Sequence, residues 1–326
     1  MDIGAKESPE IHLARRVQEK YKLSPPIDVK EILRKYAELK YEDIPIAGVD
    51  GVSLGLKVPG KKPSVIINSN NPPARLRFTE AHELGHILIP WHMGSILDHL
   101  DSGGADQHDI YWTQEQEANN FAAELLMPTQ WVADLVSKEK NFARCHRLVC
   151  EGCEVSPLAA ANNLISHLPS NLVYVCESQG KVDFSGRTKG TFAKIPAWGI
   201  DFDPSSFEYA EQHYSEKVGN KLLHWWVLPS KVSAVTFDQR DWREILNNIV
   251  DSIGVEPEKQ AKFKSSINGV IAFANSSVKR TENYSPEAIV AACIQRMHGR
   301  EAFQAVVAHE DFMAFAAKKA IDLFSK

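Results

Sequence analysis

The sequence His82-Glu83-Leu84-Gly85-His86 constrains this chain more than any other feature. It lies in an apolar stretch, 74–89, whose spacing predicts a helix that ends at Pro90. Residues four apart lie on one face of a helix, so the two imidazoles can bind one cation from the same side. Imidazole nitrogen suits zinc, and the glutamate beside the first histidine can act as a general base toward a water. The pattern therefore predicts a catalytic metal site.

A catalytic zinc site usually has three protein ligands and one open position. No third histidine follows the motif closely, because the next residues are Ile-Leu-Ile-Pro. A second predicted helix, Thr113–Leu126, can supply a carboxylate instead. Its geometry favours Glu115 as the third ligand, with Glu117 as the alternative. Asn119 lies one turn after Glu115 and can bind the outer ring nitrogen of a ligand histidine.

Two sequence blocks resemble the ImmA/IrrE family of metallopeptidases. Residues 77–86 (Arg-Phe-Thr-Glu-Ala-His-Glu-Leu-Gly-His) are similar to that family's Arg-Phe-Thr-x-Ala-His-Glu-Leu-Gly-His block. Residues 115–128, from the Glu-x-x-Ala-Asn start to the Leu-Leu-Met-Pro end, look like its second block. The resemblance is specific for 28–128, weaker for 129–169, and does not extend beyond 170.

The resemblance implies a zincin-like fold with His82, His86 and Glu115 as zinc ligands and Glu83 as the catalytic residue. One Zn²⁺ per chain is then the expected cofactor, although Mn²⁺ or Fe²⁺ could occupy such a site. It further implies a protein substrate, namely a helix-turn-helix transcriptional repressor whose cleavage relieves repression in response to a signal. The alternative is a regulatory protein that uses the same cleft only to hold a repressor or toxin. Retention of Glu83 favours the enzyme, because a metal scaffold needs no base.

Peptide hydrolysis also needs a group that stabilises the oxyanion of the intermediate. Four side chains between the ligand helices are candidates for this role: His92, His99, His108 and Tyr111. The pattern does not choose among them. All four lie in 91–111, where glycines and aspartates predict a loop or an irregular insertion.

The predicted fold class is α+β, with a zincin-like peptidase domain over 1–128, a small helix-turn-helix-like module over 129–169, and a separate α+β domain over 170–326 that could be regulatory. The predicted helices are 10–22, 29–39, 74–89, 113–126, 131–137, 142–151, 157–168, 242–253, 256–274, 286–297 and 311–324. The predicted strands are 52–56, 64–68, 172–176, 191–195, 222–228 and 232–237.

Composition narrows the function classes. The chain of 326 residues has 37 Lys plus Arg and 42 Asp plus Glu, a formal charge of −5 that does not suggest a general nucleic-acid binder. Its sequence shows neither an apolar run long enough for a membrane helix nor a secretory signal, so a cytoplasmic location is expected. Residues 156–167, the second helix of the helix-turn-helix-like module, contain no Lys or Arg, so direct DNA binding is not expected. The sequence indicates no oligomeric state.

For three further features of the sequence, a structural role is favoured over a functional one. Cys150 and Cys153 form one CxxC without a second pair, so buried cysteines are favoured over a second metal or a redox dithiol. Trp225 and Trp226 are adjacent in a predicted strand and should face opposite sides, one in the core and one at a lid or interface. Glu124 is expected to be a solvated surface charge.

Overall fold

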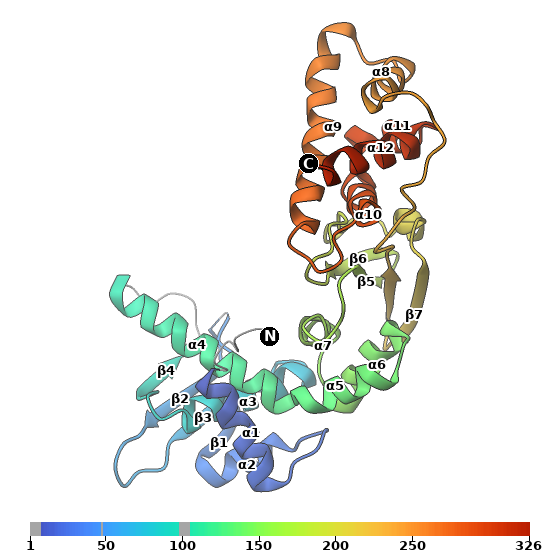
Figure 1. Ribbon diagram of the computed structural model, residues 1–326. Coiled ribbons are helices and arrows are strands. Elements are labelled where there is room, and N and C mark those ends of the chain that lie inside the picture. Colours follow the sequence, from blue (N-terminus) through green and yellow to red (C-terminus); the bar gives the residue numbers. More distant parts are fainter. Residues whose placement is uncertain (1–7, 47, 98–104) are drawn as a thin grey trace. The chain divides into compact units, whose positions relative to one another are not determined.

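The computed structural model describes residues 8–46, 48–97 and 105–326, although the side chains of 97 and 105–109 are not described (Figure 1). The chain separates into two compact units, Met1–His167 and Leu168–Lys326. Both units combine helices with one four-stranded sheet, so the α+β class is observed. The division at 128 and 169 stays a prediction. In the described part of the chain, no helix is both long and apolar enough to span a membrane.

In the first unit, the helix that carries the histidine motif packs on a four-stranded sheet. Its elements are α1 (Pro9–Tyr21), α2 (Val29–Tyr36), β1 (Glu38–Glu42), β2 (Gly51–Leu56), β3 (Ser64–Asn68), α3 (Pro73–Leu88), β4 (Gly94–Leu97), α4 (Ala105–Leu126), α5 (Thr129–Lys138), α6 (Phe142–Cys153) and α7 (Pro157–Leu164). The sheet order is β1-β3-β2-β4, with β1 parallel to β3 and the other pairs antiparallel. Helix α3 packs against β2, β3 and α4.

Helices α3 and α4 approach closely at Gly85. A Cβ atom there would lie 3.1 Å from Phe121 Cδ1 and 3.3 Å from the Cα atom of Ala118. All three residues lie in the apolar interior or at its edge, where Phe121 and Ala118 are fully buried. Because a larger residue at 85 would force the helices apart, glycine sets the distance between the elements that carry the motif and the second sequence block.

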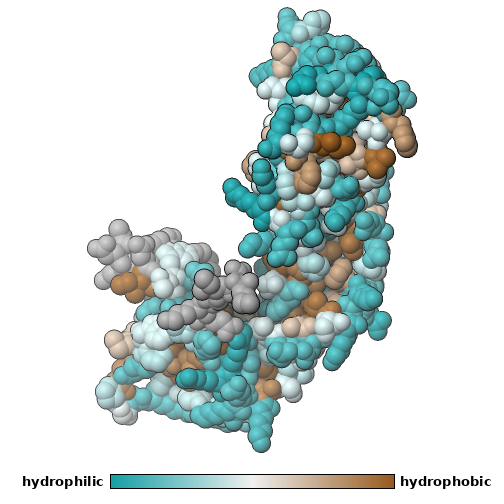
Figure 2. All heavy atoms as spheres, in the orientation of Figure 1, coloured by the Kyte–Doolittle hydropathy of each residue, from teal (hydrophilic) through white to brown (hydrophobic). Residues whose placement is uncertain are grey.

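The second unit consists of an antiparallel sheet followed by a group of helices. Its elements are β5 (Leu172–Ser178), β6 (Lys181–Arg187), a 3₁₀ turn (Pro204–Phe207), β7 (Gln212–Val218), β8 (Lys221–Val227), α8 (Trp242–Ser252), α9 (Pro257–Val278), α10 (Pro286–Met297), a second 3₁₀ turn (Glu301–Phe303), α11 (Gln304–Val307) and α12 (Phe312–Phe324). The strand order is β6-β5-β8-β7. One apolar cluster joins the helices and another lies on the sheet around Trp226. Hydrophilic residues cover most of the face drawn in Figure 2.

Two predicted strands, 191–195 and 232–237, are irregular in the structure. Their backbone groups find partners outside a sheet: the Phe192 N–H donates to the Gln295 side chain at 3.1 Å. The first N–H of the second segment donates to the Glu287 carbonyl at 3.1 Å. Conversely, the sequence pattern does not predict β1, β4, β6 and β7, which alternate or mix polar and apolar residues.

Two other predictions from the sequence are wrong: the extent of a loop and the exposure of Glu124. Helix α4 begins at Ala105, so the predicted loop over 91–111 is wrong for its last part as well as for β4. Glu124 is not a solvated charge but is buried, paired with Arg15 at 3.0 Å and accepting from Thr129 Oγ1 at 2.6 Å. This occurs because α1 packs against α4.

The tryptophan pair and the cysteines lie in interior positions. Trp225 and Trp226 are both buried, so neither serves as an exposed lid. All five cysteines are buried. Burial raises the pKa of the Cys145 thiol to about 11 and that of Cys153 to about 12, which suppresses the reactive thiolate that a redox dithiol needs.

Candidate metal centre

The motif helix and α4 bring three metal-binding side chains together. His82 and His86 project from α3, Glu115 projects from α4, and one ligand-type atom of each lies within 4.8 Å of the other two. The Nε2 atoms of the two histidines are 2.9 Å apart. Glu115 Oε2 lies 3.2 Å from His82 Nε2, and its Oε1 lies 3.3 Å from His86 Nε2. Within the described ranges no other group of three such residues meets this criterion.

These separations fit a small cation. Tetrahedral ligands at bond lengths of about 2.0–2.1 Å lie about 3.3 Å from one another. All three side chains are buried, and Glu115 Oε1 has no hydrogen-bond partner. Burying an unpaired carboxylate oxygen is costly, so a cation among these atoms would remove a penalty that the protein otherwise bears.

A chain of hydrogen bonds sets the tautomer of His86. His92 is fully buried, and burial lowers its pKa, so its ring is neutral at neutral pH. Its Nε2–H donates to Glu117 Oε2 at 2.9 Å, because a carboxylate only accepts. His92 Nδ1 must therefore accept from His86 Nδ1–H, also at 2.9 Å. The Nε2 atom of His86 then keeps its lone pair and directs it at the cluster, as a metal ligand requires.

Two other residues of α4 contact histidines: Asn119 contacts His82, and Glu117 contacts His92. Asn119 Oδ1 lies 3.0 Å from His82 Nδ1, one turn beyond Glu115 as the helix geometry predicts. Glu117, the alternative ligand, lies outside the cluster and accepts from Trp91 Nε1 at 2.7 Å as well as from His92. Both candidate ligand histidines therefore have an outer partner: His82 contacts Asn119 on α4, and His86 contacts His92.

Glu83 lies against β2. Its Oε2 accepts a hydrogen bond from Ser53 Oγ, and both side chains are buried. The neighbouring Gly51 is required by space, because a Cβ there would overlap Glu83 Oε1 and come within 2.8 Å of Thr79 Cγ2. The sequence gives no signal for these two contacts except the glycine at the start of a strand, which can mark a close approach.

The four oxyanion candidates fall in different situations. His92 has both ring nitrogens engaged by the contacts above. Tyr111 is half-buried on α4 and makes an edge contact with Trp112. His99 lies outside the described residues, and so does the side chain of His108, although its backbone belongs to α4.

Part of this chain resembles known proteins. A family model described as the IrrE N-terminal-like domain matches residues 37–164. The radiation response metalloprotease IrrE of Deinococcus radiodurans is 29% identical over 150 residues, which is 42% of this chain and 43% of that protein. Its counterpart from Deinococcus deserti is 29% identical over 144 residues, covering 40% of this chain and 48% of the relative. The chain thus spans less than half the length of these curated relatives.

A solved structure of a Mycobacterium tuberculosis transcriptional regulator aligns with 67% of this chain and 86% of its own. Its TM-score is 0.38 at 12% identity, values that support no conclusion about fold or function.

Proposed function

We propose that the chain is a zinc-dependent endopeptidase of the ImmA/IrrE family, because residues 37–164 match the IrrE N-terminal-like domain and part of the chain is 29% identical to two IrrE metalloproteases. The observation that carries the proposal is the buried convergence of His82, His86 and Glu115 beside Glu83 on the same helix as the histidines. Mn²⁺ or Fe²⁺ would satisfy the same nitrogen and oxygen donors.

In the proposed reaction the chain's own residues hold the metal and move the proton. His82, His86 and Glu115 would be the ligands, and the bound ion would polarise the scissile carbonyl and acidify a water. Glu83 would take the proton of that water and pass it to the leaving amine. Ser53 would fix one oxygen of the Glu83 carboxylate by donating to Oε2, which orients the other oxygen toward the space that Gly51 leaves open.

We further propose the following from the sequence. The substrate is a helix-turn-helix transcriptional repressor, whose cleavage relieves repression after a signal. Residues 129–169 form a helix-turn-helix-like module that does not bind DNA directly, and 170–326 regulates the peptidase. The protein acts in the cytoplasm. Tyr111, His99 and His108 stay candidates for the oxyanion donor.

The test compares wild type with Glu83→Gln in the full chain. Both proteins should bind about one zinc per chain, because Glu83 is not a proposed ligand. Wild type should cut a co-encoded helix-turn-helix repressor at one site, and the variant should be slower by about 10²–10⁴-fold. Glu19→Gln, an exposed carboxylate on α1, is the matched control and should cleave normally.

The competing function is a binding protein that holds a repressor in the same cleft. It predicts equal zinc content, stable association with the repressor in both proteins, and cleavage by neither. That result would contradict the enzyme proposal. Absence of metal from purified wild type after growth with zinc would contradict both.

A further inference from the structure

The second unit contains an arginine with an unusual environment. Arg296 lies in the last turn of α10, and its guanidinium carbon is 4.1 Å from the ring centroid of Phe273 and 4.2 Å from that of Phe192. The guanidinium is therefore held between two aromatic faces, an arrangement that fixes its orientation.

The charge of Arg296 has no carboxylate partner. Its Nη2 donates to Ser277 Oγ at 3.1 Å, while its Nε is buried without a hydrogen-bond partner. Burial and the positive charges of Arg300 and Arg187 lower its pKa to about 10. Among the described residues no ion pair within 4.0 Å involves Arg296 or Arg300. Cations that lower one another's pKa gain most from a bound anion.

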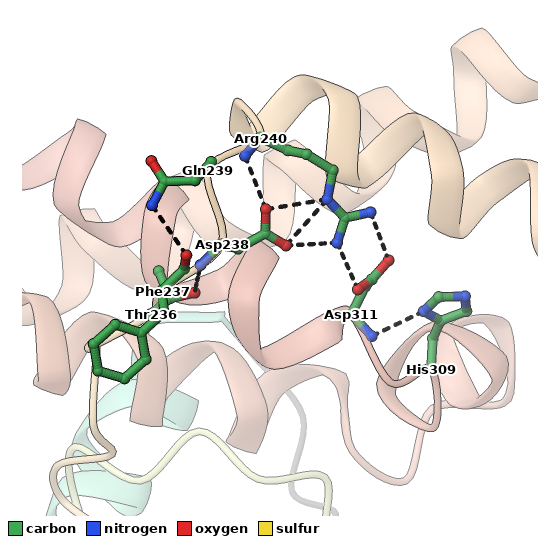
Figure 3. Close-up of polar contacts among 7 residues, drawn as sticks. All are labelled: Thr236, Phe237, Asp238, Gln239, Arg240, His309 and Asp311. Carbon is green, nitrogen blue, oxygen red and sulfur yellow. Dashed lines mark hydrogen bonds and ion pairs between the residues drawn. The ribbon is translucent and has the colours of Figure 1, made fainter.

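Arg240 in the same unit shows the opposite solution. Its guanidinium donates to both oxygens of Asp311 at 2.7 and 3.1 Å and pairs with Asp238 (Figure 3). The backbone N–H of Asp311 also donates to His309 Nδ1 at 3.1 Å, which holds Asp311 in place. Arg240 is thus neutralised by two carboxylates, whereas Arg296 in the same unit has no carboxylate partner among the residues that the structure describes.

A pocket opens beside Arg296. It has a volume of about 310 Å³ and is lined by one face of α9 together with two arginines: Ser266, Gly269, Val270, Phe273, Arg296 and Arg300. No lining residue is acidic. A Cβ built at Gly269 would meet nothing within 4 Å. Glycine is unfavourable inside a helix, and here no packing contact explains it, so its effect is to keep this wall of the pocket open.

We propose that this pocket binds a small organic anion. Arg296 and Arg300 would hold its carboxylate or phosphate group, because the guanidinium fork matches both geometrically. The apolar part of the ligand would lie against Phe273 and Val270. The volume is at the small end of ligand sites, which limits the ligand to about the size of a substituted single ring. This site is independent of the proposed peptidase activity.

Calorimetric titration of the full chain tests the site with phenyl phosphate, benzoate, inorganic phosphate and neutral phenol. We expect saturable one-to-one binding of phenyl phosphate or benzoate, and none of phenol. Tighter binding of one of the two aromatic anions identifies phosphate or carboxylate as the natural group. Equal binding of inorganic and phenyl phosphate would overturn the organic part of the proposal.

Variants separate the site from a general effect of charge. Arg300→Gln removes an exposed lining cation and should weaken binding about 10- to 100-fold, as expected for a charge-assisted hydrogen bond. Arg280→Gln makes the same charge change on an exposed residue outside the pocket lining and should leave affinity unchanged. Gly269→Phe should block binding by filling the pocket, whereas Gly269→Ala should retain it.

The proposal is overturned if neither aromatic anion binds at millimolar concentration, or if Arg300→Gln and Gly269→Phe bind like wild type. Equal weakening by Arg280→Gln would also overturn it, because the effect would then be nonspecific charge. Thermal melts of each variant without ligand verify that the fold is retained.

Discussion

The two units bury different kinds of side chain. The first places carboxylates and imidazoles in its interior, whereas the second buries almost only apolar residues. The buried polar residues of the first unit are Glu10, Ser53, Thr79, Glu80, His82, Glu83, His86, His92, Glu115, Glu124 and His146. In the described part of the second unit they are Thr188, Thr191, His224 and Gln295. No carboxylate belongs to this second group.

The difference agrees with the positions of the two proposed sites. Burying charged groups is unfavourable unless they are paired or bind a metal. Glu124 is paired with Arg15, whereas His82, His86 and Glu115 converge on one point in the interior. The pocket of the second unit is lined instead by Arg296 and the exposed Arg300, without a buried carboxylate. The contrast can be tested by perturbing one kind of group at a time.

The largest effect should follow loss of the α4 ligand. Glu115→Ala removes one of the three proposed metal ligands and should weaken zinc binding by about 10³-fold, if roughly a third of the ~10–16 kcal/mol of a structural zinc site is lost with it. Competition with a chromophoric chelator measures the affinity. Removing zinc from wild type should lower only the melting transition of the first unit. A matching shift of the second unit would break the contrast.

The second-largest effect should be a loss of folding stability at acid pH. Burial lowers the pKa of His146 from 6.5 to about 4, while its Nε2–H donates to the Pro157 carbonyl at 2.7 Å. The unfolded state therefore binds the proton first, so stability is full above about pH 6.5 and is lost as pH falls toward 4. The loss should reach about 3 kcal/mol for this group. Urea unfolding across this range measures it.

The variant His146→Gln keeps a donor for Pro157 but cannot titrate. It should be less stable than wild type at pH 7.5, yet its stability should fall less steeply between pH 6.5 and 4. Identical slopes for the two proteins would assign the acid sensitivity to other groups.

The sequence predicts the part of the site that is local and misses the part that depends on packing. Spacing within one helix places His82 and His86 on the same face, since that geometry needs no tertiary contact. Ser53 reaches Glu83 only because one face of β2 packs on α3, and that register is set by the whole sheet. Glu124 looks solvated for a similar reason, since its partner Arg15 lies on a helix far away in sequence.

The fold shows the same division. Capping residues predict where helices begin better than where they end. Helix α7 starts after the predicted Ser156 cap, which accepts from the Ala159 N–H at 3.2 Å, but it ends at Leu164 rather than at residue 168. Edge strand β7 is missed because its side chains are mostly polar and half-exposed. The strand predicted over 191–195 does not form, and its Phe192 N–H donates to the Gln295 side chain instead of to a neighbouring strand.

A third effect should distinguish catalysis from metal binding. Gly51→Ala places a methyl group against the Glu83 carboxylate and should displace it. Repressor cleavage should fall about 100-fold, because misplacing a catalytic group by about 1 Å has that cost. Zinc content should not change. A variant that loses zinc together with activity would show instead that the methyl group disturbs the whole cluster.

The smallest effect should come from the outer partner of His86. Glu117→Gln removes the charged acceptor of His92 and weakens the preference for the ligand tautomer. Zinc affinity should fall about 10-fold, at the lower end of what such outer partners contribute. Glu19→Gln is again the surface control. Unchanged affinity would mean that His86 is oriented by α3 alone.

The packing of α4 against α3 at Gly85 determines when the site can form during protein synthesis. Both histidines leave the ribosome well before Glu115, and at about 5–20 residues per second the intervening segment takes a few seconds to make. Until α4 emerges and its Ala118 docks on Gly85, the nascent chain has the histidine pair but no carboxylate to complete the set. The proposed peptidase is therefore synthesised in an inactive state and acquires its site only when the two helices have packed.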